Sequence, residues 1–102
     1  MNSNDRTIAY TILSQLGGNR FCAMIGVSSN STIPGGLLTA FKARATNKAN
    51  RVKITLRGDD TYEVMFLRVW GSTTTVISTF DNVYAEALVQ LFETETGLAT
   101  HL

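Results

Sequence analysis

The chain has 102 residues, of which 44% are hydrophobic and 17% are charged, and its formal net charge is +1. This length fits one domain that spans residues 1–102. A single cysteine and a single histidine exclude a disulfide scaffold and a zinc cluster. Most one-domain enzymes need several converging titratable groups, so this composition favours a small non-enzymatic binding protein.

The sequence carries no feature of a targeting or membrane segment. Residues 1–6 are polar and lack the basic and apolar regions of a secretory signal. No apolar run approaches the ~20 residues that cross a bilayer. We therefore expect a cytoplasmic protein without a membrane partner.

The N-terminal segment predicts a helix. Ile8, Ile12 and Leu16 recur at every fourth position, which is the spacing of one apolar stripe on an amphipathic helix. The glycine pair at 17–18 should end this helix, because glycine adopts the left-handed conformation of a helix C-terminus without a Cβ clash.

The segment after this helix predicts two strands separated by a loop. Residues 21–27 are mostly apolar, as expected of a short central strand. Residues 28–36 are rich in serine, asparagine and glycine and predict a loop longer than a tight hairpin. A second strand is expected over residues 37–44, followed by a polar connection at 45–50.

Three further strands are predicted in the second half of the chain. Apolar and polar residues alternate over residues 51–57, which is typical of a strand with one buried face. A turn at 58–60 leads into a long strand at 61–70, so these strands should form a β-hairpin. The β-branched segment 73–80 favours a fifth strand.

A final helix completes the predicted fold. Tyr84, Leu88 and Leu91 have helical spacing, and Gly97 should end this helix. Consecutive strands joined by short turns favour antiparallel pairing. We therefore expect an α+β fold of about five antiparallel strands in one sheet, with the N-terminal and C-terminal helices packed on one face.

The small net charge conceals two halves of opposite sign. Residues 1–58 contain eight basic residues and one acidic residue, which gives +7. Residues 59–102 contain one basic and seven acidic residues, which gives −6. The distribution of charge is therefore more informative than its total.

On each of two neighbouring predicted strands, the basic residues occupy alternate positions and so point to one face. If the strands pair, these residues could form one strip on the solvent face of the sheet. Cations on strands beside an aromatic ring resemble the sites of single-strand binders, in which phosphates pair with Lys and Arg and bases stack. Phe41 has the opposite parity and would reach the strip only from an edge or through a bulge. Trp70, beside a turn, is a second stacking candidate, although packing in the core or at the sheet edge is favoured for it. The predicted nucleic-acid-binding residues are Lys42, Arg44, Arg51, Lys53, Arg57, Phe41 and Trp70.

Other interpretations of the same charges remain open. Solvated strand faces often carry Lys and Arg for solubility, and Glu63 could pair with Lys53 or Arg51 and neutralise part of the strip. The acidic half could instead mimic nucleic acid toward a basic partner protein, in a protein–protein interaction module. The two charged halves could also meet across a homodimer.

No constellation in the sequence predicts catalysis. His101 lies one residue from the end of the chain, where a catalytic base is poorly held. Asp59, Asp60 and Glu63 could bind a divalent cation, but acidic residues are also ordinary in a hairpin turn. We expect no catalytic residue, no metal site and no cofactor.

Several segments, in order and at similar separations, resemble an uncharacterised family of small proteins encoded by phages and prophages. These segments are residues 11–21 (TILSQLGGNRF), 23–26 (AMIG), 52–62 (VKITLRGDDTY), 83–86 (VYAE) and 96–98 (TGL). Residues 28–50 depart from the pattern. The resemblance implies a phage or mobile-element origin and brings no catalytic residue with it. With such an origin, the partner of an interaction module would be a host factor that the protein inhibits or recruits.

Overall fold

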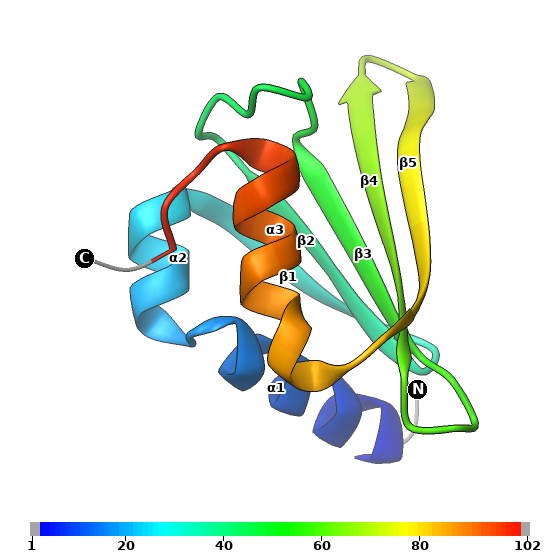
Figure 1. The fold of residues 1–102 in the computed structure, drawn as a ribbon. Coiled ribbons are helices and arrows are strands. Elements are labelled where there is room, and N and C mark those ends of the chain that lie inside the picture. The colour runs from blue at the N-terminus through cyan, green and yellow to red at the C-terminus, as the bar shows by residue number, and fades with distance from the viewer. Residues whose placement is uncertain (1–2, 101–102) are drawn as a thin grey trace.

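Five strands form one antiparallel sheet in which the spatial order of the strands follows their order in the chain (Figure 1). The computed structural model describes residues 3–100. The helices are α1 (Ser3–Leu16), α2 (Asn19–Ile25) and α3 (Leu88–Thr96), the last preceded by a 3₁₀ turn, η1 (Ala85–Ala87). The strands are β1 (Val27–Ile33), β2 (Gly36–Phe41), β3 (Arg51–Leu56), β4 (Tyr62–Trp70) and β5 (Thr73–Val83). The predicted α+β class is confirmed.

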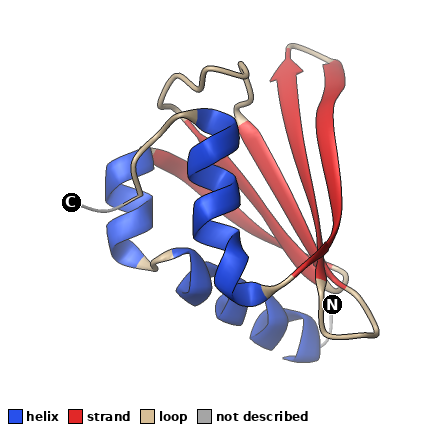
Figure 2. Ribbon diagram, in the orientation of Figure 1, coloured by secondary structure: helices blue, strands red, loops and turns tan. Residues whose placement is uncertain are grey.

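The helices cover one face of the sheet and leave the other face open (Figure 2). Alternate residues of a strand point to opposite faces, so Val52 and Ile54 of β3 point toward the helices and are fully buried. Phe66 of β4 and Phe92 of α3 pack against each other in the same core. The layers are therefore a single sheet and a single layer of helices, with the core between them.

The segment predicted as a first strand is a helix. Residues 19–25 form α2, in which Phe21 and Ile25 are fully buried. These residues lie four positions apart and thus share one side of a helix. A short apolar run does not distinguish a buried helix from a strand, and here the glycine pair before it allows the chain to begin a new helix.

The predicted loop over residues 28–36 is wrong as well. Residues 27–33 form β1, which pairs with β2, and only a tight turn at Pro34 and Gly35 separates the two strands. Backbone hydrogen bonds to β2 outweigh the low strand propensity of serine and asparagine. Because β1 lies at the sheet edge, its polar side chains reach water.

Two other boundaries differ from the prediction, and one of them affects the candidate site. β2 ends at Phe41 rather than at residue 44, so Lys42 and Arg44 lie in the connection to β3. β5 continues to Val83, with Asn82 in a left-handed conformation (φ 56°), and delays the start of the last helix. The predicted end of that helix is confirmed at Gly97, which has φ 71°.

The other predicted elements are confirmed within one or two residues. The first helix ends at Leu16, and the strands at 51–57 and 61–70 pair as a hairpin. None of the helices in residues 3–100 is long and apolar enough to cross a membrane.

Candidate nucleic-acid interface

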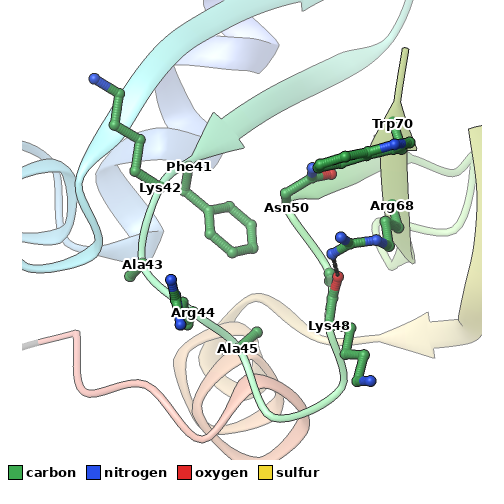
Figure 3. Close-up of a pocket in the computed structure, with 10 residues that line it drawn as sticks. Phe41, Lys42, Ala43, Arg44, Ala45, Lys48, Asn50, Arg68 and Trp70 are labelled. Atoms are coloured by element: carbon green, nitrogen blue, oxygen red, sulfur yellow. Dashed lines mark hydrogen bonds between the residues drawn. The ribbon is translucent and has the colours of Figure 1, made fainter. Parts of the chain in front are cut away.

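A basic groove lies at one end of the sheet, between the connection from β2 to β3 and the end of the β4–β5 hairpin (Figures 1 and 3). Its volume is about 650 Å³. The lining residues carry four cationic side chains and no carboxylate; they are Phe41, Lys42, Ala43, Arg44, Ala45, Lys48, Ala49, Asn50, Arg68 and Trp70.

One wall of the groove is the connection at residues 42–50, and backbone hydrogen bonds fix its shape. The Phe41 N–H donates to the carbonyl of Asn50 at 3.0 Å and closes the base of the connection. The Thr46 N–H donates to the carbonyl of Thr96 at 2.8 Å, which ties the connection to the end of α3. Lys48 adopts φ 69°, so the chain turns sharply there.

Asn50 joins this wall to the opposite one. Its side-chain amide donates to the carbonyl of Val69 at 2.9 Å, and its Oδ1 accepts from the Val69 N–H at 2.8 Å. The two bonds imitate a strand pair and hold the end of β4 beside the connection. Arg68 and Trp70 flank Val69 on this strand, and both side chains lie on the groove side (Figure 3).

Arg68 links Lys48 to Trp70. One guanidinium nitrogen of Arg68 donates to the carbonyl of Lys48 at 3.0 Å. The Arg68 Cζ lies 5.5 Å from the centroid of the Trp70 ring, within the range of a cation–π contact. Trp70 is 75% exposed, so a large aromatic surface stays open to solvent beside Arg68.

The predicted basic strip does not exist as one surface. Arg51 and Lys53 lie on the open face of the sheet, opposite the helices, because they alternate with Val52 and Ile54. Lys42 and Arg44 leave that face because β2 ends before them. The strip is thus divided between the groove and the far face of the sheet.

Arg57 lies outside the groove and beyond the last residue of β3, and it is ion-paired. It follows β3 at the end opposite the groove, and its Nη2 lies 2.6 Å from Glu63 Oε2 and 3.6 Å from Asp81 Oδ1. Glu63 thus neutralises part of the predicted strip, but its partner is Arg57 rather than Lys53 or Arg51. These acidic neighbours make Arg57 a poor phosphate contact.

The two aromatic candidates have different environments. Phe41 borders the groove but is only 3% exposed, and its ring contacts Phe92 edge-to-face at 5.6 Å between centroids. Its inward parity on β2 places it in the core, so it offers no face for stacking. Trp70 is the only tryptophan of the chain, and it is exposed, whereas the sequence favours its packing in the core or at the sheet edge.

Sequence reasoning missed Lys48 and Arg68. Lys48 lies within the segment predicted as a plain connection. Arg68 lies two residues before Trp70 on one strand, and this spacing is a signal that their side chains share a face. Arg68 is the one basic residue of the acidic half of the sequence, and the fold brings it to the basic groove.

The acidic residues considered as a metal site form a turn. The Thr61 hydroxyl and N–H donate to Asp59 Oδ1 at 2.6 and 3.2 Å, and these hydrogen bonds lower the pKa of the Asp59 carboxyl. Among residues 3–100 no three His, Cys, Asp or Glu side chains come together as metal ligands would. His101 lies outside the described residues.

Comparisons with known proteins found no relative of this chain. No family model, no curated protein and no solved structure matches the chain. The resemblance to small phage proteins stays a prediction, and the function is argued from the groove.

Proposed function

We propose that this protein binds single-stranded nucleic acid in the basic groove. The observation that carries the proposal is the exposed Trp70, which contacts Arg68 in a groove whose lining includes four basic residues and no carboxylate. Phosphates favour such a cationic surface, and an unpaired base favours an exposed aromatic face.

The arrangement of Trp70 supports stacking of a base. Arg68 lies beneath the indole ring (Figure 3), and its hydrogen bond to the Lys48 carbonyl keeps the guanidinium in place. The ring is therefore supported on one side and open to solvent elsewhere. Stacking of one base on an aromatic ring contributes about 1–3 kcal/mol.

The remaining cations support contacts with phosphates. Lys42, Arg44 and Lys48 are exposed and follow one another along the connection. Arg44 and Lys48 form no ion pair within residues 3–100, in contrast to Arg57. An extended strand that passes between this connection and Trp70 would meet cations along its backbone and an aromatic ring for one base.

A titration with a labelled single strand tests the function. The probe is a fluorescein-labelled oligothymidylate of about 20 nucleotides, measured by anisotropy at two salt concentrations. The only tryptophan provides a second signal, because a base stacked on Trp70 should quench its emission. Heparin carries anionic groups but no bases. It should therefore compete with the oligonucleotide for the groove without quenching the emission of Trp70.

Matched variants locate the site. Arg44→Ala/Lys48→Ala should weaken binding and reduce the slope of log K against log salt by about 1.4, or about 0.7 per lost phosphate contact. Arg6→Ala/Arg20→Ala removes the same charge from exposed positions on α1 and α2 and should change binding little. Trp70→Ala should weaken binding by roughly 5- to 150-fold.

A third double variant tests the open face of the sheet. Arg51→Ala/Lys53→Ala should bind nearly as the parent does, because these side chains lie away from the groove. Equal binding by the groove variant and the Arg6/Arg20 control would refute the site. Absence of binding at low salt would refute the function and favour a protein partner instead.

A further inference from the structure

The edge strand β5 leaves a regular segment of backbone without a neighbour. Residues 73–76 pair with β4 on one side only, with Thr73 opposite Trp70 and Val76 opposite Leu67. All four residues are exposed, and in the described part of the chain no hydrogen bond joins them to any element other than β4. In Figure 1 this part of the hairpin projects beyond the layer of helices.

The sequence of this edge lacks the usual protection against pairing. Residues 73–80 contain no charged residue and no proline, and six of these eight residues are β-branched. Natural edge strands commonly carry Lys, Pro or a bulge that prevents pairing with another chain. The register of β5 with β4 shifts at Ile77 and again at residues 81–82, so residues 73–76 stay regular.

The opposite edge of the sheet is different. α1 packs beside β1, and the side chain of Asn30 engages both Thr39 and Cys22. The register of β1 is also irregular between Val27 and Ser29. β1 therefore has a helix beside it and begins with an irregular pair, whereas residues 73–76 pair regularly with β4.

We propose that two copies of this chain pair through residues 73–76 of β5, antiparallel about a two-fold axis at Thr75. In this register Thr75 lies opposite Thr75 of the second copy, and Thr74 lies opposite Val76. Only uncharged β-branched residues face each other, so self-pairing brings no like charges together. A two-fold pairing of this kind closes after two copies and leaves no further edge of the same type.

The pairing has a consequence for the groove. The two-fold axis of an antiparallel pair is perpendicular to the sheet, so both layers of helices and both grooves lie on one side of a continuous sheet. Arg68 and Trp70 lie on β4, directly beside residues 75 and 73 of β5. The two β4 strands are then separated by three strand spacings, or about 15 Å. The dimer thus unites two basic grooves on one surface.

Sedimentation equilibrium without nucleic acid tests the pairing. The average mass should rise from that of one chain toward that of two as the concentration approaches about 1 mM. Thr74→Lys/Val76→Lys places repelling charges across the two-fold axis and should keep the protein monomeric. Ser29→Lys/Ser31→Lys adds the same charge to exposed positions of β1 and should dimerise as the parent does.

A measurement on the unchanged chain provides a second test. Exchange of the backbone amides in residues 73–76 should slow as the protein concentration rises, whereas exchange in residues 27–33 should not change. A monomer at all concentrations, or a dimer that survives the β5 substitutions, would overturn the proposal. Equal loss of the dimer in the β1 control would also overturn it.

The pairing can fail while the proposed function stands. The β5 substitutions leave the cations and Trp70 of the groove in place, so that variant should bind an oligonucleotide of about 6 nucleotides at least as tightly as the parent. Loss of the dimer with retained binding of this short probe therefore separates the two proposals.

Discussion

Asn50 is the residue on which the geometry of the groove depends most, and its replacement by alanine gives a sharp test. Its side chain forms both hydrogen bonds that join the connection at residues 42–50 to Val69. Its backbone bonds to Leu67 and Phe41 do not involve the side chain and remain in the variant. Asn50→Ala thus removes the link between the walls without removing the strand pairs beside it.

The expected magnitude follows from the number of bonds lost. Each hydrogen bond contributes about 1 kcal/mol net, so the end of β4 should lose about 2 kcal/mol of local stability. If the hairpin end opens independently of the core, this loss should make the Val69 amide exchange roughly 30-fold faster. If it opens only with the whole domain, the melting temperature should fall by about 8–16 °C.

Hydrogen exchange measured by NMR distinguishes these outcomes and includes a control. Asn19→Ala changes an exposed asparagine on α2 and should leave the Val69 amide as protected as in the parent. Asn50→Asp keeps an acceptor for the Val69 N–H but sets a carboxylate oxygen against the Val69 carbonyl, so it should also destabilise the hairpin end. An unchanged melting temperature together with unchanged Val69 exchange in Asn50→Ala would refute this account of the wall.

Three further substitutions test other parts of the fold. Tyr62→Phe removes the 2.8 Å hydrogen bond to Gln15 and should cost about 1 kcal/mol in urea unfolding. Because burial raises the pKa of Tyr62, the unfolded chain deprotonates first and the parent should lose stability above pH 10, a loss that this variant should lack. Gly36→Ala places a Cβ against a backbone carbonyl of β3 and should cost several kcal/mol, measured by thermal unfolding. The hydrogen bonds from Thr61 lower the pKa of Asp59 from its ordinary value of 3.8, so their stabilisation is present above that pH and lost as the pH falls through the lowered value. Asp59→Asn should therefore show a weaker loss of stability in acid, measured by chemical unfolding from pH 5 to pH 2.

Strong periodicity made part of the fold predictable from sequence. Residues 51–57 alternate apolar and polar side chains, and β3 follows at 51–56 with its apolar residues buried. The spacing of four residues between Ile8, Ile12 and Leu16 likewise predicts α1. In both cases the pattern is long enough for only one secondary structure to bury every apolar residue.

Weak or short sequence patterns gave wrong predictions where contacts with distant residues determine the secondary structure. Residues 21–25 are apolar, and both a buried helix and a buried strand would suit them. The contact of Phe21 with Phe92, far along the chain, is part of the packing that favours the helix. Residues 27–33 have polar side chains typical of a loop, but pairing with β2 makes them a strand. Such choices depend on partners that are distant in the sequence, so local propensity does not reveal them.

The candidate site shows the same division. The position of Trp70 beside a turn is a local feature that made it a candidate contact residue, but its exposure depends on the helices ending short of it (Figure 1). The meeting of Arg68 with the Lys48 carbonyl joins residues twenty positions apart and has no local signal. The error in the end of β2 then assigned Lys42 and Arg44 to the wrong surface.

The segregation of charge along the chain therefore becomes a site only through the fold. Of the basic half, Arg57 is paired with two carboxylates, and Arg51 and Lys53 lie on the far face of the sheet. The groove instead gains Arg68 from the acidic half, held there by the contact between β4 and the connection at 42–50. Binding should for this reason depend on which cations are removed rather than on how many. The difference between the Arg44/Lys48 and Arg6/Arg20 variants measures that dependence, because the two variants have the same net charge.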